Sequence, residues 1–407
     1  MHKGFCIRII PTREQSEYFW KASNAARFIY NWSLEERKRL YEEGISETGY
    51  GMCKRLTILK KQEEYSWLNE VHNKVLKRAV LDCDESFKKF FKGKSRFPKF
   101  HSRKKTTPSF YVESEIIEKM LASSDGTVET KKTPKMRFSR ENTVTLSKIG
   151  KVRLSKSAKE YGLWYLTEHA IPISNARVKY DGKYWNLTFT VEIPTRQEKL
   201  TEEVIGIDLG VKNTAICSNG EVYSNVNKKN KNIAKLEKRK KRYQRRIARK
   251  YQLNKQGNKF KKTNNIKKLE QKVREIDRDL SNKRKTYNHQ ISRDIVNRKP
   301  KAIVMEKLNI SGMMKNKHLS RAIQQQNLYQ LKSFIKYKAE SQGTRFIEAS
   351  VTYKSTQLCS RCGHMHKMSL SIRTYKCPVC GLELDRDVNS SYNLRNYGQK
   401  NLLAAQA

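Results

Sequence analysis

The chain has 407 residues, which suits two or three domains, and its 86 Lys and Arg against 40 Asp and Glu give a formal charge of +46. This excess repels itself in a compact chain unless a polyanion neutralises it, so nucleic acid is the first candidate partner. A hydrophobic fraction of 37% argues against general disorder, and without an 18-residue apolar run or a signal-peptide core we expect neither a membrane span nor secretion.

The N-terminal region predicts one strand followed by helices. Residues 3–10 alternate and stop at Pro11, and Thr12 with Gln15 then forms a capping box. Apolar residues at helical spacing predict a helix that continues to Gly44, and two more helices over 52–62 and 70–92. An all-helical segment therefore follows the first strand.

Residues 108–200 predict a small antiparallel barrel or sheet, which we expect the first strand to join. β-rich runs at 143–146 and 151–154 flank Gly150, and runs at 177–180 and 184–191 flank Asp181-Gly182. Asp-Gly between two such runs is a strong hairpin signal. The segment 118–135 fits no pattern.

Residues 228–300 predict two long antiparallel helices with basic outer faces. This stretch holds 28 Lys and Arg against six Asp and Glu, a net charge of +22. Apolar residues spaced three and four apart form a seam on each helix, with Gly257 between the two. A disordered basic insert is the alternative, but the regular seam favours helices, and the one-sided charge favours contact with phosphates.

Four cysteines near the C-terminus have the spacing of a structural zinc site. Two Cys-x2-Cys pairs are separated by fourteen residues: Cys359 and Cys362, then Cys377 and Cys380. Each pair can place two sulfurs about 3.5–4 Å apart on one tetrahedral Zn²⁺, and glycine follows each pair, as tight turns require. Unconnected thiols and a redox pair are the alternatives, which two pairs so close together disfavour.

Three segments place carboxylates in or beside apolar strands. Asp208 follows the apolar run 204–207, Glu306 ends the run 302–305, and Asp387 lies shortly before a predicted helix. Carboxylates from separate elements could converge on two Mg²⁺ or Mn²⁺ ions, which activate water and stabilise the leaving oxygen of a phosphodiester.

Each carboxylate also has an ordinary structural explanation. Asp208 could end a strand, Glu306 could pair with a lysine, and Asp385 or Asp387 could cap the helix. Together, in a polycationic chain, they indicate hydrolysis of nucleic-acid phosphodiesters.

The chain resembles the TnpB family, transposon-encoded relatives of type V CRISPR nucleases, over nearly its whole length. Residues 26–31, 97–100 and 355–363 resemble further signatures of the family. The segments that resemble its split RuvC domain are Ile207-Asp208-Leu209-Gly210, Met305-Glu306-Lys307-Leu308, the four-cysteine module and Asp385-Arg386-Asp387-Val388-Asn389.

This resemblance implies an α+β multidomain fold. An RNase H-like (RuvC) nuclease domain would carry an inserted helical hairpin and a zinc ribbon, and an N-terminal β-barrel wedge domain would carry an inserted helical recognition domain. The implied ranges are a wedge strand at 1–11, the recognition domain at 12–107, the wedge β domain at 108–200, the RuvC-like domain at 201–354 with the basic helical pair at 228–300, the zinc-binding target-nucleic-acid module at 355–383, and the end of the RuvC-like domain at 384–407.

The resemblance also implies an RNA-guided DNA endonuclease of the prokaryotic cytoplasm and nucleoid. One chain would bind one guide RNA from the transposon end, recognise a short motif beside a double-stranded DNA target, and cut with Mg²⁺ or Mn²⁺. By motif, Asp208, Glu306 and Asp387 take the catalytic metal-ligand positions. Asp387 is preferred to Asp385 because the family's carboxylate lies two residues before the asparagine, here Asn389.

Asn73 and Lys77 fall at the positions where the family reads the DNA motif. Without the resemblance, both would be ordinary solvent-facing helix residues. The alternative functions are an RNA-guided repressor that does not cut, a transposase that joins DNA ends, and a junction resolvase that needs no RNA. The three retained carboxylates argue against the first alternative.

Overall fold

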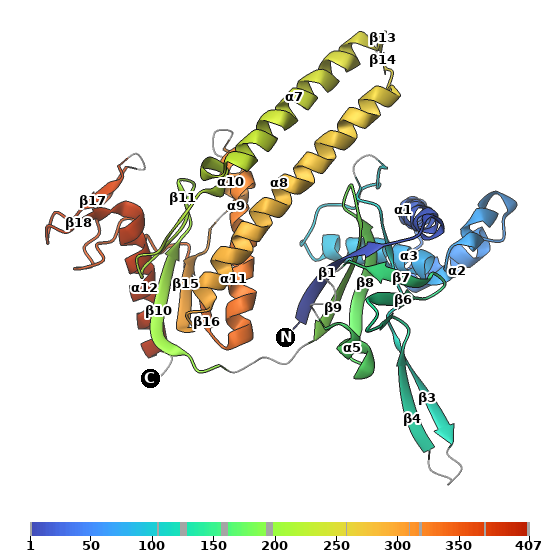
Figure 1. Cartoon of the computed structure of the whole chain (residues 1–407), viewed down its shortest axis with the longest axis horizontal. Helices are drawn as coiled ribbons and strands as arrows, with labels where there is room; N and C mark the ends of the chain where they lie inside the picture. The colour runs from blue at the N-terminus through green and yellow to red at the C-terminus, as the bar shows by residue number, and fades with distance from the viewer. Residues whose placement is uncertain are drawn as a thin grey trace. The chain divides into compact units, whose positions relative to one another are not determined.

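The computed structural model describes residues 2–103, 106–122, 128–155, 162–192, 198–257, 259–308, 310–316, 320–369 and 372–404. The chain forms two compact units, Met1–Ile193 and Pro194–Ala407 (Figure 1). In the part of the chain that is described, no helix is long and apolar enough to cross a membrane.

The helices of the first unit begin at side-chain caps. The predicted capping box starts α1 (Arg13–Glu42): the Thr12 hydroxyl accepts from the N–H of Gln15, whose side chain accepts from the N–H of Thr12. Thr48 caps α2 (Gly49–Leu59), which therefore begins earlier than the sequence predicted. A 3-10 helix over Glu63–Glu70 precedes α3 (Asn73–Phe91), so Glu70 lies outside the third helix.

The β-rich region forms an antiparallel sheet of seven strands in the order β2-β8-β9-β1-β7-β6-β5. The first strand lies inside it, between β9 and β7, as expected. Among the described strands, no ladder joins the outer strands β2 and β5, so this region forms an open sheet, one of the two predicted alternatives, rather than the β-barrel that the resemblance implies. The bounds are β1 (His2–Ile10), β2 (Ser109–Tyr111), β5 (Arg137–Phe138), β6 (Thr143–Leu146), β7 (Gly150–Leu154), β8 (Ile173–Tyr180) and β9 (Trp185–Glu192), with α5 (Trp164–Glu168) between β7 and β8.

Helices and sheet of this unit share one hydrophobic core. The ring of Phe19 in α1 lies 5.5 Å from that of Phe110 in β2 and 5.2 Å from that of Trp185 in β9. The helical and β segments thus pack as one unit, and their assignment as recognition and wedge domains stays a prediction. Residues 118–135, for which the sequence predicted no structure, overlap the hairpin of β3 (Ile116–Ala122) and β4 (Val128–Pro134). Residues 123–127 lie outside the described ranges.

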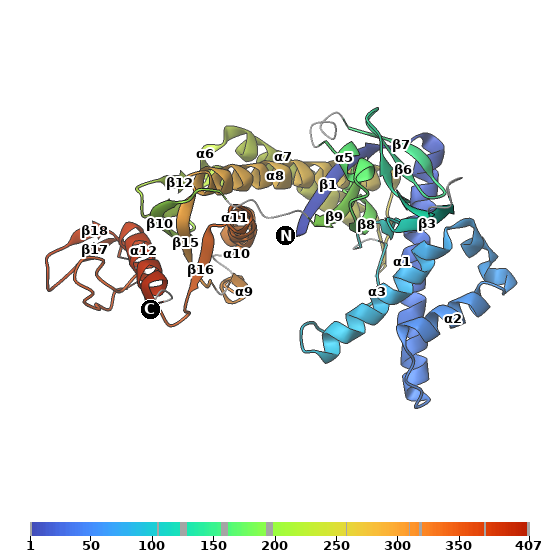
Figure 2. The same ribbon diagram turned by 90° about the horizontal axis from the view of Figure 1, so that it is seen from below.

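The second unit is built on a five-stranded sheet in the order β12-β11-β10-β15-β16, in which β10, β15 and β16 run parallel. One face packs on α12 (Arg386–Ala404), and the other on α8 (Asn264–Val296) and α11 (Leu328–Gln342) (Figure 2). The strands are β10 (Thr201–Asp208), β11 (Asn213–Cys217), β12 (Val222–Ser224), β15 (Pro300–Glu306) and β16 (Arg345–Ala349).

The predicted basic helical pair is present as α7 (Lys231–Leu253) and α8, which lie side by side in Figure 1. Their seam buries Ile233, Ile276 and Leu280. Gly257 turns the chain at the tip with a φ of +56°. The short elements of this unit are α6 (Val226–Lys229), β13 (Lys255–Gln256), β14 (Lys259–Phe260), α9 (Ile310–Met313), α10 (Ser320–Gln326), β17 (Thr374–Lys376) and β18 (Glu383–Asp385).

Candidate functional site

Asp208 lies at the end of β10, on the face of the sheet that carries α12. Side chains alternate along a strand, so Asp208 shares this face with Val204 and Gly206. Val204 packs in a cluster with Leu394 of α12, whereas Ile205 and Ile207 pack in the core on the opposite face. The strand therefore directs the Asp208 carboxylate toward the helix rather than toward α8 and α11.

Glu306 occupies the matching position on the neighbouring strand. β10 and β15 are parallel, with Ile207 opposite Met305, so Asp208 and Glu306 come next on adjacent strands. Val304 belongs to the cluster with Leu394, which places Glu306, two residues later, on the same face as Asp208. The two carboxylates thus leave the sheet side by side.

Asp387 lies in the first turn of α12, and Asp385 precedes that turn. The Asp385 carboxylate accepts from the backbone N–H of Asp387 at 2.9 Å and from that of Val388 at 3.3 Å, which is the bonding of a helix cap. Asp387 instead directs its carboxylate to arginine side chains. The structure therefore gives Asp385 a capping role, and the preference for Asp387 as the metal ligand stays a prediction.

The three carboxylates interact electrostatically. Burial, and next the negative charges of Glu306 and Asp387, raise the pKa of Asp208 well above its ordinary value. Arg386 opposes this shift and lies with its guanidinium 3.3 Å from the Asp387 carboxylate, while Arg373 lies 3.5 Å from it. The arrangement concentrates negative charge that a cation would stabilise.

Sequence reasoning missed the groups that hold Glu306. The Ser355 hydroxyl contacts Glu306 Oε1 and lies 2.9 Å from the hydroxyl of Ser390 in α12. The Lys332 ammonium of α11 donates to the Glu306 backbone oxygen at 3.2 Å. No sequence signal marked these partners, since they come from three segments distant along the chain.

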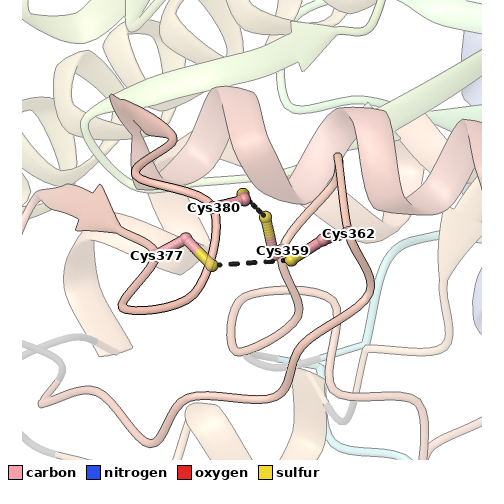
Figure 3. A group of neighbouring side chains, drawn as sticks. All are labelled: Cys359, Cys362, Cys377 and Cys380. Atoms are coloured by element: carbon pink, nitrogen blue, oxygen red, sulfur yellow. Dashed lines mark hydrogen bonds between the residues drawn. The ribbon is translucent and has the colours of Figure 1, made fainter.

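The four cysteines converge as their spacing predicted (Figure 3). Cys359 Sγ lies 3.5 Å from Cys380 Sγ, and Cys362 Sγ lies 3.6 Å from Cys377 Sγ. Both separations match two thiolates on one tetrahedral zinc ion. Hydrogen bonds from backbone N–H groups, first that of Cys380, lower the pKa of Cys377 to about 6, which favours the thiolate that zinc binds.

Each cysteine pair sits in a tight turn closed by the backbone. The N–H of Gly363 donates to the Cys359 oxygen at 2.9 Å, and that of Gly381 donates to the Cys377 oxygen at 3.1 Å. Both glycines have positive φ, +76° and +67°, a region that glycine adopts without strain. β17 and β18 form the hairpin that carries the second pair, and β18 leads directly into α12.

The two donor sets suit different metals. Among the described residues, the four cysteines are the one group of three or more His, Cys, Asp or Glu side chains whose ligand atoms all lie within 4.8 Å of one another, and four thiols suit zinc. Asp208, Glu306 and Asp387 do not meet that criterion, but Glu306 and Asp387 both act electrostatically on Asp208, and their hard oxygen donors suit Mg²⁺ or Mn²⁺. The chain therefore separates a sulfur site from a carboxylate site within one unit.

One face of α7 carries a continuous basic surface, here called the α7 basic face. Its side chains recur three and four residues apart and line one surface hollow: Lys238, Lys241, Arg242, Arg245, Arg246 and Arg249. Residues at this spacing share one side of a helix. Such a run of cations fits the phosphates of a nucleic-acid strand.

Asn73 and Lys77 are both exposed on α3, while Val75 and Ala79 are buried. The predicted outward orientation of the two polar side chains is confirmed. Their contact with the bases of a DNA motif stays a prediction.

Three family models match the chain: a helix-turn-helix domain over residues 1–46, a probable transposase over 188–317, and a Cas12f1-like TNB domain over 329–394. A putative RNA-guided DNA endonuclease of Streptomyces pristinaespiralis is 27% identical over all of this chain and 90% of its own length. The putative RNA-guided DNA endonuclease InsQ of Escherichia coli is 25% identical over 96% of this chain and 91% of its own length.

Two further similarities concern a shorter region and the fold. A TnpB-like protein of Acanthamoeba polyphaga mimivirus is 27% identical over 30% of this chain and 24% of its own length. The Cas12f1 chain of a cryo-EM complex with sgRNA and target DNA superimposes with a TM-score of 0.57 at 17% identity, over 95% of this chain and 83% of that chain. This likeness establishes an α+β multidomain fold shared with that chain.

Proposed function

Since the chain belongs to the TnpB family, we propose that it is an RNA-guided DNA endonuclease that hydrolyses phosphodiester bonds with Mg²⁺ or Mn²⁺ held by Asp208, Glu306 and Asp387. The observation that carries this proposal is the electrostatic interaction of Asp208 with Glu306 on the neighbouring strand and with Asp387 in the first turn of α12, in a chain with a net charge of +46. Carboxylates that repel one another at a partly buried site cost folding free energy unless a cation stabilises them.

The chain's own groups would hold and orient the reacting parts. When bound, divalent ions would activate water and stabilise the leaving oxygen. Asp208 and Glu306 are fixed by neighbouring strands, and Asp387 by the helix that Asp385 caps. Rigid elements place functional groups more accurately than loops do, which suits a site that must hold charged ligands in a fixed geometry.

The remaining features support the proposed partners. The α7 basic face offers sequence-independent contacts to phosphates. We propose a guide RNA from the transposon end, bound by one protein chain, and a double-stranded DNA target recognised beside a short motif. The cysteines would bind zinc that stabilises the fold and takes no part in hydrolysis.

Plasmid cleavage tests the function. The chain is purified with its RNA, that RNA is sequenced, and a plasmid with the matching target is incubated with the complex and Mg²⁺. We expect the wild type to linearise the plasmid, and Asp208→Asn, Glu306→Gln and Asp387→Asn to lose cleavage but keep guided DNA binding in a gel-shift assay. Asp385→Asn is the matched control, because it removes a capping carboxylate from the same segment and should retain cleavage.

The alternative functions give different results. Guided binding without cleavage by the wild type would identify a repressor. Cleavage without RNA would identify a resolvase-like enzyme, and joined DNA ends a transposase. Loss of cleavage in Asp385→Asn with retention in Asp387→Asn would reverse the assignment between those two residues.

A further inference from the structure

The Ser355 hydroxyl connects the zinc module to Glu306. Ser355 precedes the first cysteine pair and is 1% exposed, and its Oγ meets Glu306 Oε1 from β15 and Ser390 Oγ from α12. Three segments that are distant in sequence therefore meet at one side chain.

The chemistry of the three groups fixes the direction of each bond. An ionised carboxylate only accepts hydrogen bonds, so Ser355 must donate its one proton to Glu306. Its oxygen then accepts from the hydroxyl of Ser390, which is fully buried. A hydrogen bond to a charged acceptor is stronger than one between neutral groups, and it holds Oε1 in place while the second carboxylate oxygen stays available to a cation.

The backbone of Ser355 is itself fixed by α12. Asn393 donates to the Ser355 oxygen at 2.8 Å and to the Leu358 oxygen at 2.7 Å. Asn389 also donates to the Leu358 oxygen, at 2.7 Å, and accepts from the N–H of Ser360 at 3.0 Å. These bonds hold the segment that runs directly into Cys359, so one side of the segment is fixed by α12 and the other by the cysteine site.

We propose that Ser355 is a positioning residue that orients the Glu306 carboxylate for divalent-metal binding and connects this carboxylate to the segment that carries the zinc-binding cysteines. This inference rests on the proposed function, because it requires Glu306 to be a metal ligand. Removing a hydrogen-bond partner of a metal ligand typically weakens metal affinity by about 10–100-fold. The zinc site, which does not use the Ser355 side chain, keeps its metal.

The test measures metal binding directly. Full-length, zinc-loaded protein is titrated with Mn²⁺, and free Mn²⁺ is followed by electron paramagnetic resonance; zinc content and thermal unfolding are measured on the same samples. The variants are Ser355→Ala, Ser355→Thr, which retains a hydroxyl, and Glu306→Gln. Ser350→Ala is the matched control, since it removes an exposed hydroxyl that bonds only locally to Thr352 in the same part of the chain.

We expect Ser355→Ala to bind Mn²⁺ about 10–100-fold more weakly with its zinc retained, Ser355→Thr to recover most of that loss, and Ser350→Ala to match the wild type. Wild-type Mn²⁺ affinity in Ser355→Ala, or loss of zinc together with Mn²⁺, would overturn the inference. If Glu306→Gln weakens Mn²⁺ binding and Ser355→Ala does not, only the role of Ser355 fails. If Glu306→Gln binds like the wild type, the metal-site proposal fails with it.

Discussion

Gly206 of β10 lies against the backbone of α12, where a Cβ would stand 2.1 Å from the Ser391 oxygen. A second close approach lies further along the helix, since a Cβ on Gly398 would stand 2.3 Å from Val304 Cγ2 in β15. Two glycines, one on a strand and one on the helix, thus let α12 pack directly on the sheet. Because Asp208 and Asp387 lie just beyond this contact, the helix–sheet spacing sets how closely their carboxylates approach.

We expect Gly206→Ala to destabilise the protein and to weaken divalent-metal binding. The added methyl group meets backbone rather than a flexible side chain, so the helix must shift, and overpacking of this kind typically costs about 1–3 kcal/mol. Urea unfolding and Mn²⁺ titration measure the two effects. Gly4→Ala in β1 is the matched control, because its Cβ would have no atom within 4 Å, and a comparable loss there would refute the packing argument.

The raised pKa of Asp208 predicts the pH dependence of stability without divalent metal. The folded protein holds this proton to higher pH than the unfolded chain, so the contribution of Asp208 to stability falls as pH rises from about 4 through the raised folded-state pKa. Asp208→Asn has no such proton. Its thermal midpoint should exceed that of the wild type at pH 8, and the advantage should shrink as pH falls.

Thermal unfolding of both proteins across this pH range, with zinc present and Mg²⁺ absent, tests the prediction. Adding Mg²⁺ should stabilise the wild type more than the variant, because only the wild type offers the full set of carboxylates. An advantage of Asp208→Asn that is independent of pH would show that ionisation of Asp208 does not strain the fold.

Zinc should be bound at about one ion per chain and should stabilise the C-terminal module. Cys377→Ser removes one of four thiolates and opens a closed tetrahedral site, so zinc content and thermal stability should both fall. Because zinc binds thiolates and protons compete with it for sulfur, zinc should be retained at neutral pH and released on acidification. Metal analysis checks this, with Cys6→Ser, an exposed cysteine of β1, as the control.

Local signals predicted much of the fold. The Thr12–Gln15 capping box and the Asp181-Gly182 hairpin depend on neighbouring residues, and both are present. The cysteine site was also predictable, because zinc ligation constrains spacing within short segments. α2 begins at Gly49 rather than at the predicted residue 52, because the Thr48 hydroxyl caps the helix there.

Long-range packing was not predictable from the sequence. The hairpin of β3 and β4 is charged, with Lys132 pairing with Glu118 at 3.2 Å, and carries little apolar alternation to mark it. The bonds of Ser355 and Asn393 and the close approach of Gly206 depend on which face of the sheet α12 covers. That choice follows from the assembled core, not from any one segment.

Neutralising the α7 basic face should weaken nucleic-acid binding for all sequences alike. The variant carries Lys241→Gln, Arg242→Gln, Arg245→Gln and Arg246→Gln. Each lost phosphate contact should reduce the slope of log affinity against log salt by about 0.7–0.9. Filter binding over a salt series measures this slope. The charge-conserving variant Arg242→Lys with Arg245→Lys should keep the slope, and an unchanged slope in the four-fold variant would exclude this face as a phosphate contact.

We expect Asn73 and Lys77 to contribute to the choice of DNA target. They lie four residues apart on the exposed side of α3, so they can present two side chains to one groove. Asn can bond N6 and N7 of adenine, and Lys can donate to O6 and N7 of guanine. Each such contact is worth about 1–3 kcal/mol of discrimination between bases.

A depletion screen over a randomised motif beside the target compares the wild type with Asn73→Ala and Lys77→Ala. We expect each variant to lose preference at one or two motif positions and to keep it elsewhere, because a base contact affects only the base that it reads. Lys74→Ala is the control: its ammonium lies 3.2 Å from the Glu115 carboxylate, so it is held by the protein itself and its loss should leave the motif unchanged. Identical motif profiles for all four proteins would show that this face of α3 does not read DNA, whereas a uniform fall in depletion across motifs would reassign Lys77 to the phosphate backbone.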